Sequence, residues 1–248
     1  MTDARSEQPR HEWYALSSDV ELHAVRWDPI AAADADLAPW LLVHGLASNA
    51  RLWDGVAQHL AGLGHRVVAI DQRGHGRSSK PDDGYEMSTV ADDLMLLNEA
   101  LGRQRPGVAG QSWGGNVVLE LAHRHPDAVA AIACVDGGFI DLGVRFPEWD
   151  DAATALAPPR LAGTPLDRIT AWLETSAADW PAEGRAGTLA NFEVRDDGTI
   201  APWLTFDRHL TVLRGLWEHQ PSSRYPYVSV PTLLIAADTG DVLSLIHI

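Results

Sequence analysis

One serine in this sequence stands between two glycines at a spacing that suits an attacking nucleophile. The pattern G-x-S-x-G is met by Gly110-Gln111-Ser112-Trp113-Gly114 and describes a serine on a sharp turn between a strand and a helix. The turn strains the serine backbone, and a Cβ atom two positions before or after it would crowd the turn, so glycine is favoured at both places. We therefore predict that Ser112 is a nucleophile at the carboxyl edge of a sheet, with its hydroxyl projecting into solvent.

The residues around this turn predict the strand and the helix that it requires. Val108 and Ala109 read as the end of a short buried strand. The stretch 116–125 has apolar side chains at helical spacing and is ended by Pro126. Gly115 should allow this helix to pack closely against the strand, because glycine has no side chain to hold the two apart.

Charge and cysteine content limit the partners of the chain. Its 248 residues carry a net charge of −15 and no basic cluster, which argues against nucleic acid and anionic membranes as partners. Cys134 is the only cysteine, so we expect a core residue and neither an internal disulfide nor a cysteine-based metal site. With no visible signal peptide and no apolar run of membrane-spanning length, we expect a cytoplasmic protein. The sequence does not indicate an oligomeric state.

The first part of the chain alternates between predicted strands and helices. A disordered lead over 1–11 and a hairpin over 13–27 are followed by buried strands near 40–43, 66–70, 108–109 and 129–135, with helices between them. For the first helix, over 51–62 and its end, we predict an apolar face formed by Leu52, Val56, Leu60 and Leu63. Such alternation predicts a doubly wound, mostly parallel sheet with helices on both faces. Ligands then bind at the carboxyl ends of the strands.

The pattern changes after residue 138. No buried strand is predicted over 139–225, and this stretch is rich in tryptophan, proline, aspartate and alanine. We interpret it as an inserted helical cap. A buried strand returns at 231–237. The expected organisation is therefore a first part of the core over 1–138, a cap over 139–225, and a return strand with a tail over 226–248.

Three segments together resemble the α/β-hydrolase superfamily, in its cap-bearing branch with a serine nucleophile. They are the stretch 41–46 with its His44-Gly45 pair, the glycine-rich turn 71–78, and the turn around Ser112. The resemblance covers about residues 12–241 and implies the α/β fold described above. It also implies an oxyanion hole made by the backbone N–H groups of Leu46 and Trp113. His44 and the charged residues of the turn 71–78 are expected to brace the loops rather than to react.

The same resemblance implies a carboxylate that orients a histidine, and three aspartates are candidates. Asp241 follows the 231–237 strand, where relatives commonly carry the acid, and we favour it. Asp136 ends the preceding strand, a position that some members use instead. Asp238 is a further alternative, three residues before Asp241.

The expected histidine is harder to find. The chain order should be serine, acid and then histidine, but seven residues follow Asp241 and the loop to His247 is too short to fold back onto Ser112. His209 and His219 lie in the predicted cap, where surface or packing roles are expected. We therefore expect the last helix, the last strand and the catalytic histidine to be missing from the chain as given, and the 231–237 strand to form an exposed sheet edge.

The favoured function is hydrolysis of a small or medium, largely apolar carboxylic ester or lactone through an acyl-enzyme on Ser112. No metal or organic cofactor is required, and the partner is a small-molecule substrate. One alternative is C–C bond hydrolysis of a diketone with the same triad. Another is a non-catalytic binding protein of this fold, or an inactive fragment. Dehalogenase and epoxide hydrolase chemistry is disfavoured, because those relatives use a carboxylate where Ser112 stands.

Overall fold

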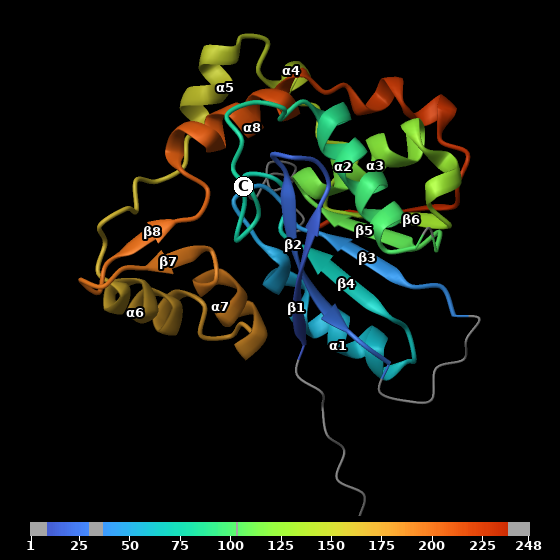
Figure 1. Ribbon diagram of the computed structural model, residues 1–248. Helices are drawn as coiled ribbons and strands as arrows, with labels where there is room; N and C mark the ends of the chain where they lie inside the picture. Colours follow the sequence, from blue (N-terminus) through green and yellow to red (C-terminus); the bar gives the residue numbers. More distant parts are fainter. Residues whose placement is uncertain (1–8, 30–36, 103, 238–248) are drawn as a thin grey trace, which may run out of the picture.

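The computed structural model describes residues 9–29, 37–102 and 104–237. At its centre lies a seven-stranded sheet with the order β1-β2-β4-β3-β5-β6-β9 (Figure 1). Its strands are β1 (Arg10–Ala15), β2 (Glu21–Trp27), β3 (Trp40–Val43), β4 (Val67–Ile70), β5 (Gly107–Gln111), β6 (Ala131–Val135) and β9 (Thr232–Ile235). The pairs β1·β2 and β2·β4 are antiparallel and all other pairs are parallel. The predicted α/β class is confirmed, and β1 extends two residues into the segment predicted as a disordered lead.

Helices cover both faces of this sheet. The helices of the core are α1 (Asp54–Gly62), α2 (Met87–Ala100) and α3 (Trp113–Arg124), with short 3-10 turns η1 (Ala50–Trp53) and η2 (Pro126–Ala128). Side chains of α2 and α3 join the larger apolar core, which includes Leu41, Val43 and the fully buried Cys134. On the other face, η1 and α1 pack over Leu42 and its neighbours. Successive side chains of β3 point alternately into the two cores, which explains why the sequence of this strand is apolar throughout.

The apolar face predicted for the first helix is wrong at three of its four positions, and only Leu60 packs against the core, partly buried. Leu52, Val56 and Leu63 are 42%, 47% and 58% exposed, whereas Trp53, Ala57 and Ala61 are buried against the sheet. Small alanine side chains let the helix approach the strands closely, so tertiary packing rather than side-chain size decides which face is turned inward.

Between β6 and β9 the chain builds a separate layer of short elements. They are α4 (Leu142–Arg145), α5 (Trp149–Ala155), α6 (Leu166–Ser176), α7 (Ala182–Leu189), β7 (Phe192–Val194), β8 (Ile200–Pro202), α8 (Phe206–Glu218), η3 (Pro221–Ser223) and η4 (Tyr225–Tyr227). The antiparallel β7–β8 hairpin was not expected in a helical insertion, because its strands are too short to show alternation. The domain limits 139–225 stay a prediction.

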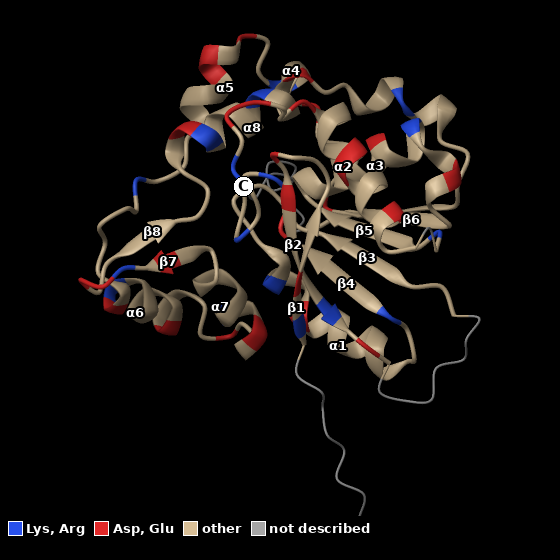
Figure 2. Cartoon of the chain, in the orientation of Figure 1, with Lys and Arg blue, Asp and Glu red and all other residues tan. Residues whose placement is uncertain are grey.

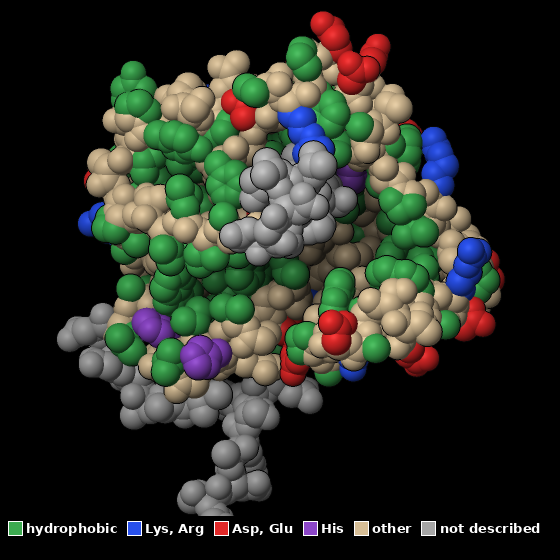
Figure 3. All heavy atoms as spheres, turned by 180° about the vertical axis from the view of Figure 1, so that it is seen from behind, with side chains coloured by type: hydrophobic (Ala, Val, Ile, Leu, Met, Phe, Trp, Pro, Cys, Tyr) green, Lys and Arg blue, Asp and Glu red, His purple; other side chains and the backbone are tan. Residues whose placement is uncertain are grey.

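Strand β9 forms one edge of the sheet in the described part of the chain. Its apolar residues Leu233, Leu234 and Ile235 are 57%, 52% and 45% exposed. Leu233 and Ile235 pair in register with Ala133 and Val135 of β6, which are themselves only partly buried. Seen from the back, hydrophobic side chains gather over this side of the sheet (Figure 3).

Charged residues lie on strands, helices and loops of both the core and the insertion (Figure 2). Acidic residues are spread over α2, α3, α5, α6 and α7 rather than gathered at one place (Figure 2). Within the described ranges, no helix is both long enough and apolar enough to cross a bilayer.

Candidate active site

The turn between β5 and α3 holds Ser112 in a strained backbone conformation. Its φ of 54° and ψ of −121° lie outside the regions that residues with a side chain normally occupy. Two backbone hydrogen bonds fix this shape: Ser112 N donates to Val135 O at 2.9 Å, and Gly115 N donates to Ser112 O at 2.8 Å. The sharp strand-to-helix turn predicted from the sequence is therefore present.

Close backbone contacts explain the glycines around the turn. A Cβ atom on Gly110 would collide with the carbonyl oxygen of Gly114, and one on Gly114 with that of His44. Gly137, after β6, has the same constraint, because a Cβ there would collide with Ser112 O. The first two contacts are those that the pattern predicts, whereas the third could not be foreseen, since Gly137 meets the turn only in the folded chain.

Ser112 does not project into solvent as predicted. Its relative exposure is 6%, because loops from neighbouring strands flank it. The nearest is the loop after β3, where a Cβ atom on Gly45 would lie 3.1 Å from Ser112 Cβ and collide with Gln111. These loops are distant from the serine in the sequence, so their contact with it could not be predicted.

The two predicted oxyanion donors lie on segments that meet at this serine. Trp113 is the first residue of α3 and Leu46 follows Gly45. Among the described residues, neither backbone N–H donates a hydrogen bond to a protein acceptor. The two groups are therefore free to bind an oxygen atom of a ligand.

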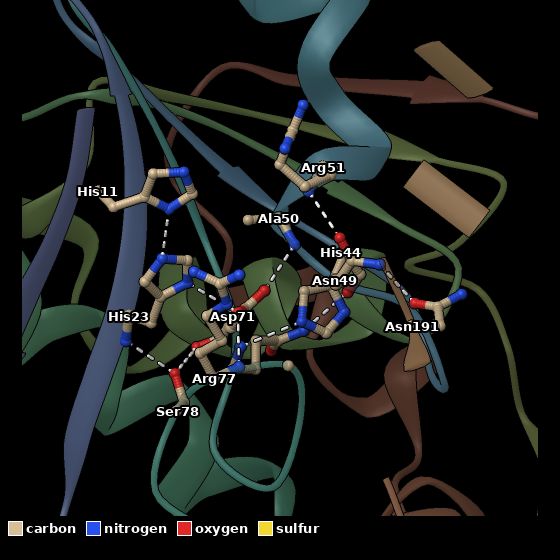
Figure 4. Close-up of polar contacts among 12 residues, drawn as sticks. His11, His23, His44, Asn49, Ala50, Arg51, Asp71, Arg77, Ser78 and Asn191 are labelled. Atoms are coloured by element: carbon tan, nitrogen blue, oxygen red, sulfur yellow. Dashed lines mark hydrogen bonds and ion pairs between the residues drawn. The ribbon is translucent and has the colours of Figure 1, made fainter. Parts of the chain in front are cut away.

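Asp71, directly after β4, is the centre of a polar network that joins β2, η1 and the turn after β4 (Figure 4). Its carboxylate accepts hydrogen bonds from Ala50 N at 2.7 Å and Arg77 N at 2.8 Å, and is joined to His23 Nδ1 at 2.8 Å. Burial opposes its ionisation, but these hydrogen bonds, that of His23 foremost, lower the pKa of Asp71 to about 2. Asp71 is thus ionised and holds these segments together, which agrees with the structural role that the resemblance implied for the turn 71–78.

His44 and His75 are also held by the backbone. His44 Nε2 accepts from Gln72 N at 3.0 Å, and its Nδ1 lies 2.6 Å from Gly45 O. His75 Nε2 accepts from Ala47 N at 3.3 Å, and the ring stacks on Trp113. Burial lowers the pKa of His44, and that of His75 falls well below the usual value. With both ring nitrogens engaged, neither histidine is free to take a proton from Ser112.

Of the three candidate acids, Asp136 is among the described residues. Asp136 directly follows β6, has a φ of 48°, and donates its backbone N–H to Ile235 O at 2.6 Å. Its Oδ1 atom is buried without a hydrogen-bond partner among the described residues. Asp238 and Asp241 lie outside the described residues, as does His247.

The two histidines of the insertion are buried, which agrees with the packing role expected for them rather than with a surface role. Both His209 and His219 are 3% exposed. His219 lies 3.1 Å from Asn116 Nδ2 and 3.3 Å from Glu120 Oε2. These contacts engage both ring nitrogens of His219 with side chains of α3.

A cavity of about 330 Å³ lies between the insertion and the loop after β3. Ala47, Ser48 and Gly76 line it on the side of the core, and Trp203, Phe206 and His209 line it on the side of the insertion. The surface is hollowed between these two parts in Figure 3. Ser112 itself does not line this cavity. Across the described residues, no cluster of metal-ligating side chains is present.

Comparison with known proteins places these features in a family. The profile described as alpha/beta hydrolase fold matches residues 39–245. Epoxide hydrolase B of Mycobacterium tuberculosis is 36% identical over 106 residues, which are 42% of this chain and 30% of that protein. The 2-(acetamidomethylene)succinate hydrolase of Mesorhizobium japonicum is 34% identical over 96 residues, 39% of this chain and 34% of that protein. This chain thus spans about a third of the length of these curated relatives.

Solved structures show the same fold at lower identity. A crystal structure of E-2-(acetamidomethylene)succinate hydrolase superimposes with a TM-score of 0.74 at 22% identity, covering 92% of this chain and 81% of that one. A thioesterase domain from the curacin biosynthetic pathway gives 0.71 at 18% identity, covering 94% and 84%. Together with the profile match over most of the sequence, the strained serine turn and the sheet order show that this chain belongs to the alpha/beta hydrolase fold family.

Proposed function

We propose that the protein is a serine hydrolase of a small or medium, largely apolar carboxylic ester or lactone, with Ser112 as nucleophile. The observation that carries the proposal is the positive φ of Ser112 on a turn between β5 and α3. Strained backbone of this kind costs on the order of 1–3 kcal/mol and is retained where geometry serves function. It orients a serine side chain that a regular strand or helix could not present in this way.

The chemistry follows from the groups around this serine. Ser112 Oγ attacks the substrate carbonyl carbon while a base takes its proton, and the resulting oxyanion accepts hydrogen bonds from the N–H groups of Leu46 and Trp113. Collapse of this intermediate expels the alcohol, which takes up the proton, and leaves an acyl-enzyme. Water then attacks the acyl-enzyme by the same route and releases the acid. No step needs a metal or an organic cofactor.

The acid of the triad is proposed to be Asp241, with Asp136 as the principal rival. One feature favours the rival: Asp136 combines a positive φ with an unpartnered buried carboxylate oxygen. Such an oxygen is costly to leave without a hydrogen bond and would gain one from an imidazole N–H. Asp238 stays a third possibility. We propose that the histidine base is not among the described residues, because His44, His75 and His219 have structural partners and His209 lines a cavity that Ser112 does not line.

The relatives support hydrolysis as the class of reaction but do not identify the substrate. The two relatives named above act on different substrates: one is an epoxide hydrolase, and the other hydrolyses 2-(acetamidomethylene)succinate. We propose ester or lactone hydrolysis over epoxide opening, because a serine stands where epoxide hydrolases carry a carboxylate. C–C bond hydrolysis of a diketone would use the same groups and remains the alternative. A cytoplasmic location is proposed from the sequence alone.

A fluorophosphonate probe tests the nucleophile directly. We expect it to label Ser112, as located by peptide mass spectrometry, and labelling to be lost in Ser112→Ala. The variant should unfold at the wild-type temperature within a few degrees, because a single hydroxyl is removed. Protein that is folded yet not labelled, in a form carrying an intact histidine base, would support the non-catalytic binding protein instead.

A further inference from the structure

The strained backbone of Ser112 is packed against the end of β6 and the loop that follows it. Ser112 N donates to Val135 O at 2.9 Å, and a Cβ atom on Gly137 would collide with Ser112 O. In the same contact, a Cβ atom on Gly115 would lie 2.8 Å from the Cα atom of Gly137. A strained conformation persists only where its surroundings over-determine it. The loop after β6, residues 136–140, is therefore part of what keeps the serine in this conformation.

This loop has a strained shape of its own and is held from outside. Asp136 has a φ of 48° and Gly138 one of 77°, both in the left-handed region that residues with a side chain rarely adopt. Asp136 N donates to Ile235 O on β9, whereas backbone groups of Gly138 and Ile140 bond to side chains of other elements. Those side chains therefore decide how the loop lies against the serine turn.

Asn116, one turn after Ser112 on α3, holds the loop from the inside of the protein. Its Oδ1 atom accepts from Gly138 N at 2.8 Å and from Ile140 N at 3.3 Å. Its Nδ2 atom donates to Ile140 O at 2.7 Å and to His219 Nδ1 at 3.1 Å. The side chain is fully buried, and its amide uses both hydrogens and both oxygen lone pairs. Three of these four bonds go to the loop.

Tyr225 holds the same loop from the side of the solvent. Its hydroxyl donates to Gly138 O at 3.0 Å, so Gly138 is bonded through its N–H to Asn116 and through its carbonyl to Tyr225. The position of Tyr225 is itself fixed, because the preceding residue, Arg224, donates to Glu120 Oε2 on α3 at 2.7 Å. A residue near the end of the insertion and a residue of α3 thus meet at one glycine.

We propose that Asn116 and Tyr225 are positioning residues of the proposed active site, which clamp Gly138 and so press the loop after β6 against the turn that carries Ser112. The proposal rests on the proposed function, since it assigns further residues to the same reaction. Its physical basis is that Gly137 can support the Ser112 backbone only while the next residue is held in place. Neither side chain touches the substrate in this proposal, and both act through the orientation of the serine.

Removing the Tyr225 hydroxyl tests the clamp with little disturbance of the fold, because this side chain is 43% exposed. In the full chain, Tyr225→Phe should melt within about 4 °C of wild type but exchange amide hydrogens about two- to tenfold faster over residues 112–115 and 136–140. In a form that carries the histidine base, the rate of fluorophosphonate labelling at saturating probe should fall by a similar factor. The probe concentration for half-saturation should stay within about twofold, since binding is not altered.

The matched control is Tyr227→Phe. Tyr227 lies on the same η4 turn and is 67% exposed, and within the described part of the chain its hydroxyl makes no hydrogen bond. This variant should exchange and react like wild type.

Asn116→Ala tests the inner half of the clamp. It removes three hydrogen bonds to the loop and should slow labelling by more than tenfold. Its control is Asn98→Ala, because Asn98 is also a buried asparagine and donates to a loop carbonyl, that of Ala128, at 3.0 Å. Asn98→Ala should lower the melting temperature but leave the labelling rate within about twofold. If Asn116→Ala does not fold, Tyr225→Phe still decides the question.

The outcomes separate this inference from the proposed function. Unchanged exchange in Tyr225→Phe, or faster exchange of the loop with an unchanged serine turn and labelling rate, would overturn the positioning role even though Ser112 is labelled. If the wild type carrying the base is folded but not labelled, the assignment of the nucleophile fails. Faster exchange over residues 112–115 in Tyr225→Phe but not in Tyr227→Phe would then still support the clamp on the serine turn.

Discussion

At the scale of single residues, Asp71 shows how a buried charge can stabilise a site without taking part in its chemistry. Its carboxylate is 3% exposed and ties together residues from β2, η1 and the turn that follows β4. The hydrogen bonds outweigh the cost of burial, since the pKa of Asp71 is about 2 instead of the usual 3.8. The ionised form is therefore preferred in the folded state.

The stability of the fold should reflect this carboxylate. Because the folded pKa lies below the unfolded one, Asp71 contributes about 2 kcal/mol above pH 4, and this contribution is lost as the pH falls from about 4 towards 2. Asp71→Asn should therefore be destabilised by about that amount at pH 7, and the difference from wild type should shrink at pH 3. Urea denaturation at the two pH values measures both. Asp19→Asn, at the exposed β1–β2 turn, is the control and should change stability little at either pH.

The two rival acids can be separated by substitution in a form of the protein that hydrolyses esters. Loss of the acid that orients the histidine lowers turnover by on the order of 10⁴, whereas loss of a bystander carboxylate has a small effect. We expect the large loss in Asp241→Asn and a small one in Asp136→Asn, measured as kcat for a p-nitrophenyl ester. The reverse order would assign the acid to the end of β6.

At the scale of elements, β9 is the strand least protected from solvent. Its neighbour β6 buries Ile132 and Cys134 under α3, but the opposite side of both strands is only partly covered. An exposed apolar edge strand offers unpaired backbone groups and apolar side chains to another chain. The side of the sheet opposite α3 is therefore where self-association of this chain should begin.

A charge on this strand should reduce that association. Leu233 is 57% exposed, so Leu233→Lys removes little buried surface and adds a charge that opposes edge-to-edge pairing. We expect the variant to remain monomeric at concentrations where wild type forms larger species, as measured by light scattering after gel filtration. Leu63→Lys, a similarly exposed leucine at the end of α1, should leave the wild-type behaviour unchanged. Equal association of all three proteins would exclude β9 as the contact.

At the scale of the whole molecule, a buried polar network joins the last part of the insertion to the core. Glu120 of α3 is joined to His219 after α8 and accepts a hydrogen bond from Arg224 Nε at 2.7 Å. Burial disfavours its charge, but His219 and Arg224 lower the pKa of Glu120 to about 2. Because α8 also carries His209, this network holds the helix that forms one wall of the cavity.

Weakening this network should loosen the insertion before the sheet. Glu120→Gln removes the charge that the network stabilises and should cost about 2–3 kcal/mol. Hydrogen exchange should then increase over residues 209–228 more than in α2. The matched control is Glu218→Gln, which breaks an exposed ion pair with Arg214 on the same helix and should cost less than about 0.5 kcal/mol. Equal acceleration in both variants would show that the network does not couple the two layers.

Features that depend on local requirements could be predicted from the order of the residues. Strand and helix order around Ser112 followed from apolar runs and turn residues, and Gly110 and Gly114 followed from the lack of space at a strained turn. The structural role of Asp71 was implied only by the resemblance of the turn 71–78 to the α/β-hydrolase superfamily.

Features that depend on contacts between distant residues could not be predicted, because those contacts form only in the folded chain. In the folded chain Ala57 rather than Val56 faces the sheet, and Ser112 is buried between loops. Gly137 contacts the serine turn so closely that a side chain there would collide with Ser112 O. The fold also brings His209 to the wall of a cavity. None of these has a local signature, because packing and hydrogen-bond partners are set by contacts that form only when separate segments of the chain meet.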